Sequence, residues 1–202
     1  LRGRAIRDVI RNPEHNPFMF GIFLEETMRE AIETKRLIIK PLKLRDAPEV
    51  FELASDPAVN RFMPYRLHQS IDDTKAWLRT LQPDDLEFAF FRKEDGRLIG
   101  TGGIGKDVNG RHTLGYQLRR DAWGNGYATE AARALIAWGH IELGINDYYT
   151  EHAVQNVASE HVIRKCGFQF VRYGRYERFD HSEAFDAAFY ELHLKGEADV
   201  CR

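Results

Sequence analysis

The chain has 202 residues, of which 43% are hydrophobic and 30% are charged, with 16 glycines and 7 prolines. This composition is typical of a folded globular protein and excludes disordered and collagen-like chains. With 29 Lys and Arg against 31 Asp and Glu, the net charge of -2 gives no general positive field that would hold nucleic acid or an anionic membrane. We expect any bound anion to be held by a local site.

The cysteines and histidines show no pattern typical of a metal centre. Cys166 and Cys201 are too few and too far apart for a zinc site or a disulfide framework, and the eight histidines are dispersed. We therefore expect no metal cofactor and a reducing, cytoplasmic environment. The longest apolar run, Phe18 to Leu24, has seven residues. Since a transmembrane helix needs about 20, we expect no membrane span there.

Residues 1–33 differ from the rest of the chain and are expected to form a partly helical N-terminal extension. They combine a basic start, an Asn-Pro-Glu-His-Asn-Pro segment at 12–17 and a helical pattern over 25–31. The aromatic run at 18–24 is seldom left in water, so it is expected to cover either the main domain or a second subunit in a homodimer. Residues 34–202 are expected to form one domain.

The first half of this domain mixes extended and helical patterns. Asp95-Gly96 and Asn109-Gly110 supply the positive φ values that tight hairpin turns need. Ser70, followed by acidic residues in the next turn, predicts a capped helix start. The expected elements are strands at 36–41, 88–93, 97–106 and 113–119 and helices at 45–54 and 70–81.

The second half contains the longest helix. Apolar residues follow a 3.6-residue period from Tyr127 to Leu143, and Gly144 ends the pattern. The further elements expected are a strand at 148–154, a helix at 158–166 and strands at 168–178 and 184–194. An antiparallel meander, one strand-helix-strand crossover and a terminal hairpin together predict an α+β fold with helices on both faces of a mixed sheet.

Two glycine-rich stretches compete for the role of a phosphate-binding loop. Residues 100–105 satisfy G-x-G-x-x-G after a predicted strand, but a turn at 106–112 follows where a dinucleotide fold requires a helix. We interpret these glycines as a bulge or a close backbone approach within a strand. Gly124 and Gly126 lie instead between a strand and the long helix that begins at Tyr127.

This second stretch has the properties of a phosphate cradle. Without side chains at 124 and 126, consecutive N–H groups can point into one concavity, and the helix start adds free donors and the positive end of its dipole. Phosphate groups bind at such helix N-termini. An ordinary glycine turn, with Thr129 and Glu130 as helix-start residues, is the alternative that this stretch alone leaves open.

Five segments extend the pattern over most of the domain. They are Thr34-Lys-Arg-Leu-Ile-Ile-Lys-Pro-Leu, Leu114-Gly-Tyr-Gln-Leu, Trp123-Gly-Asn-Gly-Tyr-Ala-Thr-Glu-Ala-Ala132, Asn156-Val-Ala-Ser159 and Lys165-Cys-Gly-Phe168. In this order they resemble the GCN5-related N-acetyltransferases (GNAT), in particular the branch of RimJ- and RimL-type ribosomal-protein acetyltransferases. The resemblance covers residues 34–195 and leaves 1–33 outside.

The resemblance implies a GNAT fold, in which the mostly antiparallel sheet splays between two central strands, here 113–119 and 148–154. Unpaired backbone groups at the splay would pair with the pantetheine arm of acetyl-CoA, and the glycine loop would hold its pyrophosphate. The implied cofactor-binding residues are Gln117, Leu118 and Arg119 through their backbone, Gly124, Asn125, Gly126, Tyr127, Ala128 and Thr129 at the pyrophosphate, and Asn156 at the pantetheine.

This chain departs from the family pattern at one position of the loop. Asp121 stands three residues before the first loop glycine, where the superfamily usually has Gln or Arg. We expect a minor effect, because backbone amides do most of the binding and Arg119 or Arg120 can supply positive charge. Cys166 shares the apolar face of its helix with Val162 and is interpreted as a core residue. Transfer by direct attack needs no acyl-enzyme.

The resemblance also implies catalytic residues. Ser159 would lie near the thioester sulfur, so it is the candidate general acid for the leaving thiolate; a helix-start residue that satisfies a free N–H is the alternative. No Asp or Glu occurs at 113–119, where many relatives carry a carboxylate base. Glu177 is therefore the candidate base, and Glu151 and His152 are alternatives that would act through water.

The expected reaction is acetyl transfer from acetyl-CoA to a primary amine. A protein α-amino group has a pKa of about 7.7–8.0 and is partly neutral at pH 7, whereas lysine, at about 10.4, is almost fully charged. With the branch resemblance, this favours a protein N-terminal amine as acceptor. A small-molecule amine, such as a polyamine or aminoglycoside, and a non-catalytic acyl-CoA sensor are the alternatives. Possible acceptor contacts are Arg61, Tyr65, Arg66 and Asp180.

Overall fold

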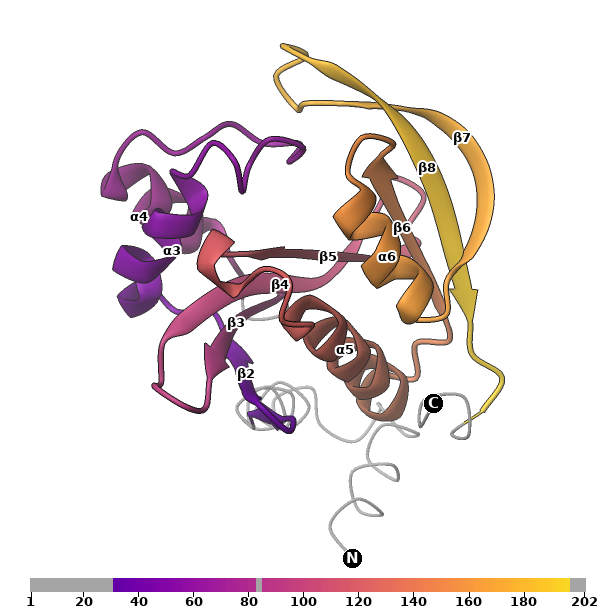
Figure 1. Cartoon of the computed structure of the whole chain (residues 1–202), viewed down its shortest axis with the longest axis horizontal. Coiled ribbons are helices and arrows are strands. Elements are labelled where there is room, and N and C mark those ends of the chain that lie inside the picture. Colours follow the sequence, from indigo (N-terminus) through magenta and orange to yellow (C-terminus); the bar gives the residue numbers. More distant parts are fainter. Residues whose placement is uncertain (1–30, 83–84, 197–202) are drawn as a thin grey trace, which may run out of the picture. The chain divides into compact units, whose positions relative to one another are not determined.

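The computed structural model describes residues 31–82 and 85–196. Within these residues the chain forms one sheet of eight strands in the order β1-β2-β3-β4-β5-β6-β8-β7 (Figure 1). The strands are β1 (Ile32–Glu33), β2 (Leu37–Pro41), β3 (Leu86–Arg92), β4 (Leu98–Lys106), β5 (His112–Leu118), β6 (Asp147–Ala153), β7 (Gln169–Glu177) and β8 (Ala184–His193). The helices are α3 (Ala47–Ala54), α4 (Ile71–Thr80), α5 (Tyr127–Leu143) and α6 (Val157–Lys165), with 3-10 turns η2 (Leu44–Asp46) and η3 (Arg120–Ala122).

The predicted α+β fold is confirmed, with shifts of a few residues at the ends of elements. The sheet is antiparallel except between β5 and β6, which α5 connects. The Ser70 hydroxyl accepts the Asp73 N–H at 3.3 Å and the Asp73 carboxylate accepts the Ser70 N–H at 2.9 Å, which is the predicted helix cap. The short β1 pairs with β2, directly before the predicted domain start at residue 34. The helical pattern and the aromatic run of the N-terminal extension lie outside the described residues.

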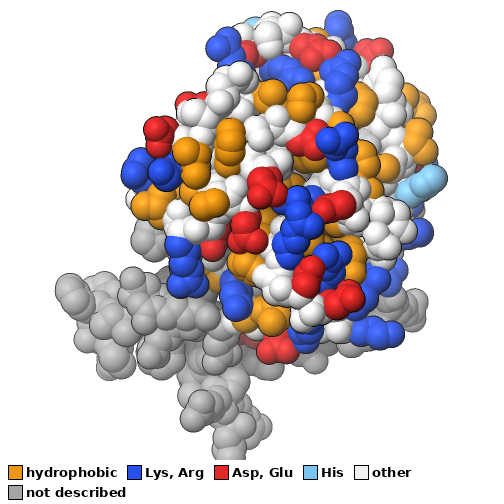
Figure 2. Space-filling view, turned by 60° about the vertical axis from the view of Figure 1, so that its left-hand side comes forward, with side chains coloured by type: hydrophobic (Ala, Val, Ile, Leu, Met, Phe, Trp, Pro, Cys, Tyr) orange, Lys and Arg blue, Asp and Glu red, His pale blue; other side chains and the backbone are white. Residues whose placement is uncertain are grey.

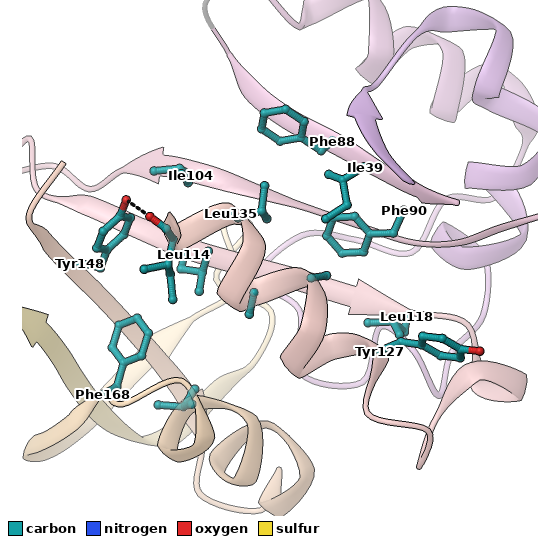
Figure 3. Close-up of a cluster of buried hydrophobic side chains, with 14 of the residues drawn as sticks. Ile39, Phe88, Phe90, Ile104, Leu114, Leu118, Tyr127, Leu135, Tyr148 and Phe168 are labelled. Atoms are coloured by element: carbon teal, nitrogen blue, oxygen red, sulfur yellow. Dashed lines mark hydrogen bonds between the residues drawn. The ribbon is translucent and has the colours of Figure 1, made fainter. Parts of the chain in front are cut away.

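The helices cover both faces of the sheet. On one face α5 and α6 pack over a large apolar cluster, to which β5 contributes Leu114 and Leu118 and α5 contributes Leu135 (Figure 3). On the other face α3 covers a smaller cluster in which Val50 and Leu53 meet Ala89 of β3. No helix among the described residues is long and apolar enough to cross a membrane.

One polar contact fixes β6 against α5 inside the large cluster. The Tyr148 hydroxyl donates to the Ile136 carbonyl at 3.1 Å (Figure 3). Tyr148 is fully buried, and a Cβ at Gly139 would lie 2.4 Å from its hydroxyl. The glycine therefore leaves room for the tyrosine, and the hydrogen bond satisfies a hydroxyl that would be costly to bury alone.

The glycines at 100–105 lie within β4 and pass close to neighbouring backbone, as the sequence predicted. A Cβ at Gly102 would lie 2.5 Å from the Gly115 carbonyl oxygen and 2.8 Å from Phe90 Cζ. A Cβ at Gly103 would lie 2.2 Å from the Leu86 carbonyl oxygen. These glycines have a packing role, and no helix follows them to form a dinucleotide site.

Gly102→Ala is therefore expected to lower the free energy of unfolding by about 1–3 kcal/mol, because the added methyl group meets rigid backbone. Gly115→Ala, on the neighbouring strand, is the matched control, since a Cβ there meets nothing within 4 Å. Urea unfolding monitored by circular dichroism measures both. Equal stability of the two variants would contradict this account of β4.

Candidate active site

The central feature of the sheet is a gap between the parallel strands β5 and β6. These strands share register at one residue pair, Thr113 and Tyr149. The Thr150 hydroxyl also donates to the Leu114 carbonyl at 3.0 Å. Beyond this point the strands run in clearly different directions (Figure 1). The C-terminal half of β5 therefore has a strand on its β4 side and a gap on its β6 side.

Alternate residues of β5 face β4 and the gap. The Gln117 carbonyl points toward β4, 2.6 Å from a Cβ built at Gly100. The Arg119 N–H donates to the Ile99 carbonyl at 2.9 Å, and its carbonyl accepts the Ala122 N–H at 3.0 Å. The expectation that Gln117 and Arg119 offer backbone groups to a ligand is therefore corrected: these groups already have partners or face a neighbouring strand.

Tyr116 and Leu118 face the gap by the same alternation. The Leu118 carbonyl accepts Trp123 Nε1 at 2.8 Å, which leaves its N–H on the gap side. Of Gln117, Leu118 and Arg119, which were expected to offer backbone groups to the gap, Leu118 alone faces it. Tyr116 faces the gap as well, although it was not predicted to do so. The register between β4 and β5 determines which residues of β5 face the gap, and this register cannot be read from the sequence of β5 alone.

The glycine loop after β5 presents a row of free donors. Gly124 and Gly126 have φ values of 76° and 78°, in the left-handed region that favours glycine. Among the described residues, no acceptor is found for the N–H groups of residues 124–129. Side chains do not fill the turn, because a Cβ at Gly124 would meet nothing within 4 Å. The loop and the α5 N-terminus have the donors and dipole that a diphosphate requires.

Asn125 closes the loop from within. Its side-chain amide donates to the Trp123 carbonyl at 2.9 Å and to the Ala122 carbonyl at 3.3 Å. Asn125 therefore contributes its backbone N–H to the row of donors while its side chain holds the turn. The same division of roles is expected of a residue flanked by two left-handed glycines.

An ionic clamp from the start of β2 holds the loop and α5 in place. The Glu130 carboxylate accepts the Thr34 hydroxyl at 2.6 Å, the Arg36 N–H at 2.8 Å and Arg36 Nε at 2.7 Å. The Arg36 guanidinium also donates to the Asn125 carbonyl at 2.9 Å and lies 4.4 Å from the centre of the Tyr127 ring. The role of Arg36 was not predicted from the sequence, although its guanidinium lies against the loop.

The arginines expected to supply charge are committed elsewhere. Arg119 pairs with Glu52 of α3 and with Asp121, and Arg120 pairs with Asp56 at 2.6 Å. Figure 2 shows one face of the molecule, on which acidic and basic side chains are interspersed. The ion pairs tie α3 to the turn before the glycine loop, so these two guanidinium groups are already neutralised by carboxylates.

Two hydroxyl groups meet at the start of α6. The Asn156 side chain accepts the Ser159 N–H at 3.3 Å and so caps the helix. The Ser159 hydroxyl lies 3.2 Å from the Tyr116 hydroxyl, which β5 directs to the same face. Burial raises the pKa of Tyr116 above its usual range, so its hydroxyl keeps its proton. Ser159 thus has both contacts at once: its backbone N–H is capped by Asn156, and its hydroxyl lies beside the Tyr116 hydroxyl.

Comparison with known proteins identifies this arrangement. Residues 36–169 match the family described as acetyltransferase (GNAT) domain. The chain belongs to the GNAT acetyltransferases. The resemblance to the RimJ- and RimL-type branch is thereby confirmed, and the chain is an N-acetyltransferase of this family.

Individual relatives of this GNAT chain cover most of its length. An uncharacterized N-acetyltransferase p20 from Bacillus licheniformis is 29% identical over 147 residues, or 69% of this chain and 83% of p20. A RimL ribosomal L7/L12 α-N-protein acetyltransferase solved with coenzyme A has a TM-score of 0.68 at 17% identity, over 82% of this chain and 98% of RimL. A spermidine N-acetyltransferase from Vibrio cholerae, solved with CoA and spermine, has a TM-score of 0.70 at 14% identity, over 84% and 100%.

The candidate bases of this acetyltransferase lie in different places. Glu177 is exposed, and its carboxylate pairs with His181 at 2.8 Å. The preceding residue, Tyr176, donates its hydroxyl to the Phe62 carbonyl. Since successive residues of a strand point to opposite faces, Glu177 points away from Phe62. His152 is buried, with its ring nitrogens 2.8 Å from the Ala153 carbonyl and 3.3 Å from the Tyr190 hydroxyl. The structure brings neither residue to Ser159.

Glu151 lies on the α3 side of β6 and is open to solvent. Desolvation by neighbouring protein atoms raises the pKa of Glu151 above its usual range, and the charge of Asp107 adds to this. Arg111 acts in the opposite direction. Glu151 therefore faces the acceptor side of the sheet, but in contact with solvent and a surface ion pair.

The expected acceptor-side segments do come together. Phe179 N–H donates to the Pro64 carbonyl at 2.7 Å, and the Arg178 guanidinium donates to the Met63 carbonyl at 2.8 Å. Arg66 pairs with Asp180, and Arg61 pairs with Glu183 at 2.8 Å. Arg61 also lines a cavity of about 250 Å³ between its segment and the β7–β8 hairpin. The segments at 61–66 and 178–184 thus form one continuous side of the site.

Removal of the clamp carboxylate by Glu130→Gln is expected to lower the free energy of unfolding by about 1–2 kcal/mol at pH 7. Burial by itself would raise the pKa of Glu130, but the hydrogen bonds from Thr34 and Arg36 outweigh it, so the pKa is lowered overall. A lowered carboxylate pKa stabilises the fold above the unfolded pKa of about 4.3, and this stabilisation is lost as pH drops through the folded pKa.

The difference between parent and Glu130→Gln should therefore shrink below about pH 4. Urea unfolding across pH 3–7 measures it, with Glu142→Gln on the same helix as the matched control. A difference that stays constant over this range would contradict the role of the charge.

Proposed function

We propose that this GNAT chain transfers the acetyl group of acetyl-CoA to the N-terminal amine of a protein. One observation carries the choice of cofactor: six consecutive N–H groups, at residues 124–129, have no acceptor among the described residues and lie directly after the free edge of β5. A diphosphate attached to an extended arm satisfies both features, since it can accept from the amides while the arm pairs with the strand edge.

The residues present fit coenzyme A. The amides of 124–129 would hold the diphosphate, and the Arg36 guanidinium, 3.6 Å from a Cβ built at Gly126, would add positive charge. The backbone of Tyr116 and Leu118 would line the pantetheine arm in the gap. Asn156, beside Ser159 at the α6 start, lies at the far end of this line. When bound, acetyl-CoA supplies a thioester whose acyl carbon an amine can attack.

The hydroxyl pair supports the departure of the thiolate. Tyr116 keeps its proton at neutral pH because burial raises its pKa, and Ser159 lies within hydrogen-bonding distance of it. A hydroxyl that donates to a developing thiolate stabilises the negative charge and can supply its proton. Ser159 is thus the proposed general acid, with Tyr116 orienting it and replacing the proton it gives away.

The choice of acceptor rests on pKa and on the structural neighbours. An N-terminal amine, with a pKa of about 7.7–8.0, needs less deprotonation than a lysine or polyamine amine near 10.4. RimL, described as acting on a ribosomal protein, supports this choice. A small-molecule polyamine is the second candidate, which the similarity to a spermidine N-acetyltransferase favours. Family membership favours both over a non-catalytic sensor. A cytoplasmic location stays a prediction.

Coenzyme A is expected to raise the melting temperature of the chain and to bind with a measurable heat. Gly126→Val should weaken this binding at least about tenfold, because a branched side chain disfavours the positive φ and displaces the amides. Gly110→Val is the matched control, since Gly110 has a φ of 76° in a turn of another hairpin. Calorimetry with coenzyme A measures both variants. Equal weakening by the two substitutions, or no heat with the parent, would contradict the proposed cradle.

Ser159→Ala is expected to lower kcat by about 10–100-fold, because the leaving thiolate loses its proton donor. Tyr116→Phe should lower kcat in the same way, and the double variant should lose little more, since both hydroxyls act as one unit. Thiol release from acetyl-CoA with an amine panel measures turnover, and calorimetry with coenzyme A checks that binding is kept. Full turnover by Ser159→Ala would remove its role as general acid.

A further inference from the structure

A half-buried carboxylate stands on the α3 side of the sheet, on strand β3. Glu87 is the acidic residue of the largely apolar strand β3, and it faces the same side as Ala89, which packs against α3. Its carboxylate lies over Gly103: a Cβ built there would be 3.0 Å from Glu87 Cδ and 3.1 Å from Oε1. The side chain therefore points along the sheet toward β5.

Two glycines keep the path from this carboxylate to the gap clear. Across the sheet, Glu87 of β3 lies opposite Gly103 of β4, and Gly103 lies opposite Gly115 of β5. Because β5 borders the gap, no further strand lies between Gly115 and the gap. We call Gly103 and Gly115 the glycine strip. Above Gly115 a Cβ would meet nothing within 4 Å. One strand spacing, about 4.8 Å, separates the two glycines, so the Glu87 carboxylate is within direct or one-water reach of a group in the gap.

The surroundings of Glu87 contain acceptors and no cation. No ion pair among the described residues includes it. The charge of Asp85 raises the pKa of Glu87, and the charge of Glu87 in turn raises the pKa of the neighbouring Tyr65 hydroxyl. The Gln117 amide, fixed by a 3.1 Å bond from Nε2 to Thr101, leaves its buried Oε1 without a donor in this part of the chain. Gln117 lies one row along from Glu87 on the same face of the sheet. A half-buried carboxylate and an unpaired acceptor on one face are both stabilised by a ligand that carries positive charge and N–H groups.

We propose that the glycine strip is the binding site for the acceptor amine and that Glu87 binds the ammonium form and takes its proton. This inference rests on the proposed acetyl transfer and adds the group that prepares the amine. It replaces Glu177 as the base. Glu151 lies across the gap on the same side, but it is exposed and Arg111 acts on it.

The protons of the reaction balance with this assignment. The ammonium gives one proton to the Glu87 carboxylate and becomes a neutral amine, whose lone pair forms the bond from nitrogen to the acyl carbon. The bond from that carbon to sulfur breaks, and its electron pair leaves with the sulfur. Nitrogen loses a second proton to water, and the thiolate takes one from the Ser159 hydroxyl. Ser159 regains its proton from Tyr116, and water reprotonates Tyr116. Glu87 returns its proton to water.

The ionisation of Glu87 suits this role. Burial, followed by the charge of Asp85, raises the pKa of Glu87 to about 7. A base near the operating pH is deprotonated in a useful fraction of molecules and still holds a proton well. Turnover should rise with pH through about 7, below the titration of spermidine amines near 10.4.

The test compares Glu87→Gln with Glu94→Gln, which makes the same chemical change at the exposed turn of the same hairpin. Thiol release is measured from pH 5.5 to 9 with spermidine and with a peptide that begins with serine. With spermidine, Glu87→Gln should lower kcat by at least about 100-fold at pH 7 and lose the rise near pH 7, while coenzyme A binding stays unchanged. With the peptide, whose α-amino group itself titrates at about 7.7–8.0, the fall in kcat is the readout. Glu94→Gln should match the parent. An unchanged rise near pH 7 in Glu87→Gln with spermidine would overturn the proposal.

A binding measurement separates this inference from the proposed function. Calorimetry with spermidine and the peptide, on the coenzyme A complex, should show weaker amine binding for Glu87→Gln than for the parent. Gly115→Ala, which places a methyl group on the strip, should raise KM while the fold and coenzyme A binding are kept. Absence of thiol release by the parent would refute acetyl transfer. The amine-binding measurement would then still test whether the glycine strip binds the acceptor amine. Equal binding of both amines by parent and Glu87→Gln, or none by the parent, would refute the site.

Discussion

The divergence of β5 from β6 after one shared register pair is the constraint on which the rest of the site depends. Thr113 and Tyr149 pair, and the strands then separate. A sheet that stayed closed would pair every backbone group of β5 and would separate its two faces. The open sheet leaves N–H and C=O groups without partners and connects the α3 side to the α6 side. The hydroxyls of Ser159 and Tyr116 and the carboxylate of Glu87 can then act on one substrate from opposite faces.

Each part of this opening is held by contacts between distant segments. The Glu130 clamp joins the start of β2 to the first turn of α5, over 94 residues of sequence between Arg36 and Glu130. Ion pairs from Glu52 and Asp56 join α3 to the turn before the glycine loop. The glycine loop, the start of β2 and helix α3 are thus parts of one connected structure. Rigid support of this kind keeps backbone donors in position before the ligand arrives.

The sequence predicted those features that local patterns determine. Helix periodicity, the Ser70 cap and the turn glycines placed the elements, and the Trp-Gly-Asn-Gly-Tyr motif located the loop of free amides. Residues whose role depends on register or on contacts between strands were missed. Arg36 reaches the loop from another strand, and Tyr116 meets Ser159 only because β5 turns alternate residues toward α6. The predicted direction of the Gln117 and Arg119 backbone groups was wrong, because it also depends on the register between β4 and β5.

The sequence did not predict the proposed role of Glu87, although a half-buried carboxylate in a largely apolar strand is unusual. Its direction over Gly103 depends on the pairing of β3 with β4, which the sequence does not state. The resemblance places the base on β5 or on a later strand. A carboxylate that reaches across a bare neighbouring strand lies outside that pattern.

The buried pair of Gly139 and Tyr148 also has a consequence for how this chain can change over evolution. The tyrosine hydroxyl occupies the space that any side chain at 139 would need. Replacement of the glycine is therefore tolerable only in a lineage that has first exchanged the tyrosine for a shorter residue, and such an exchange releases the Ile136 carbonyl from its bond to β6. Divergent descendants should accordingly keep Gly139 wherever Tyr148 is kept.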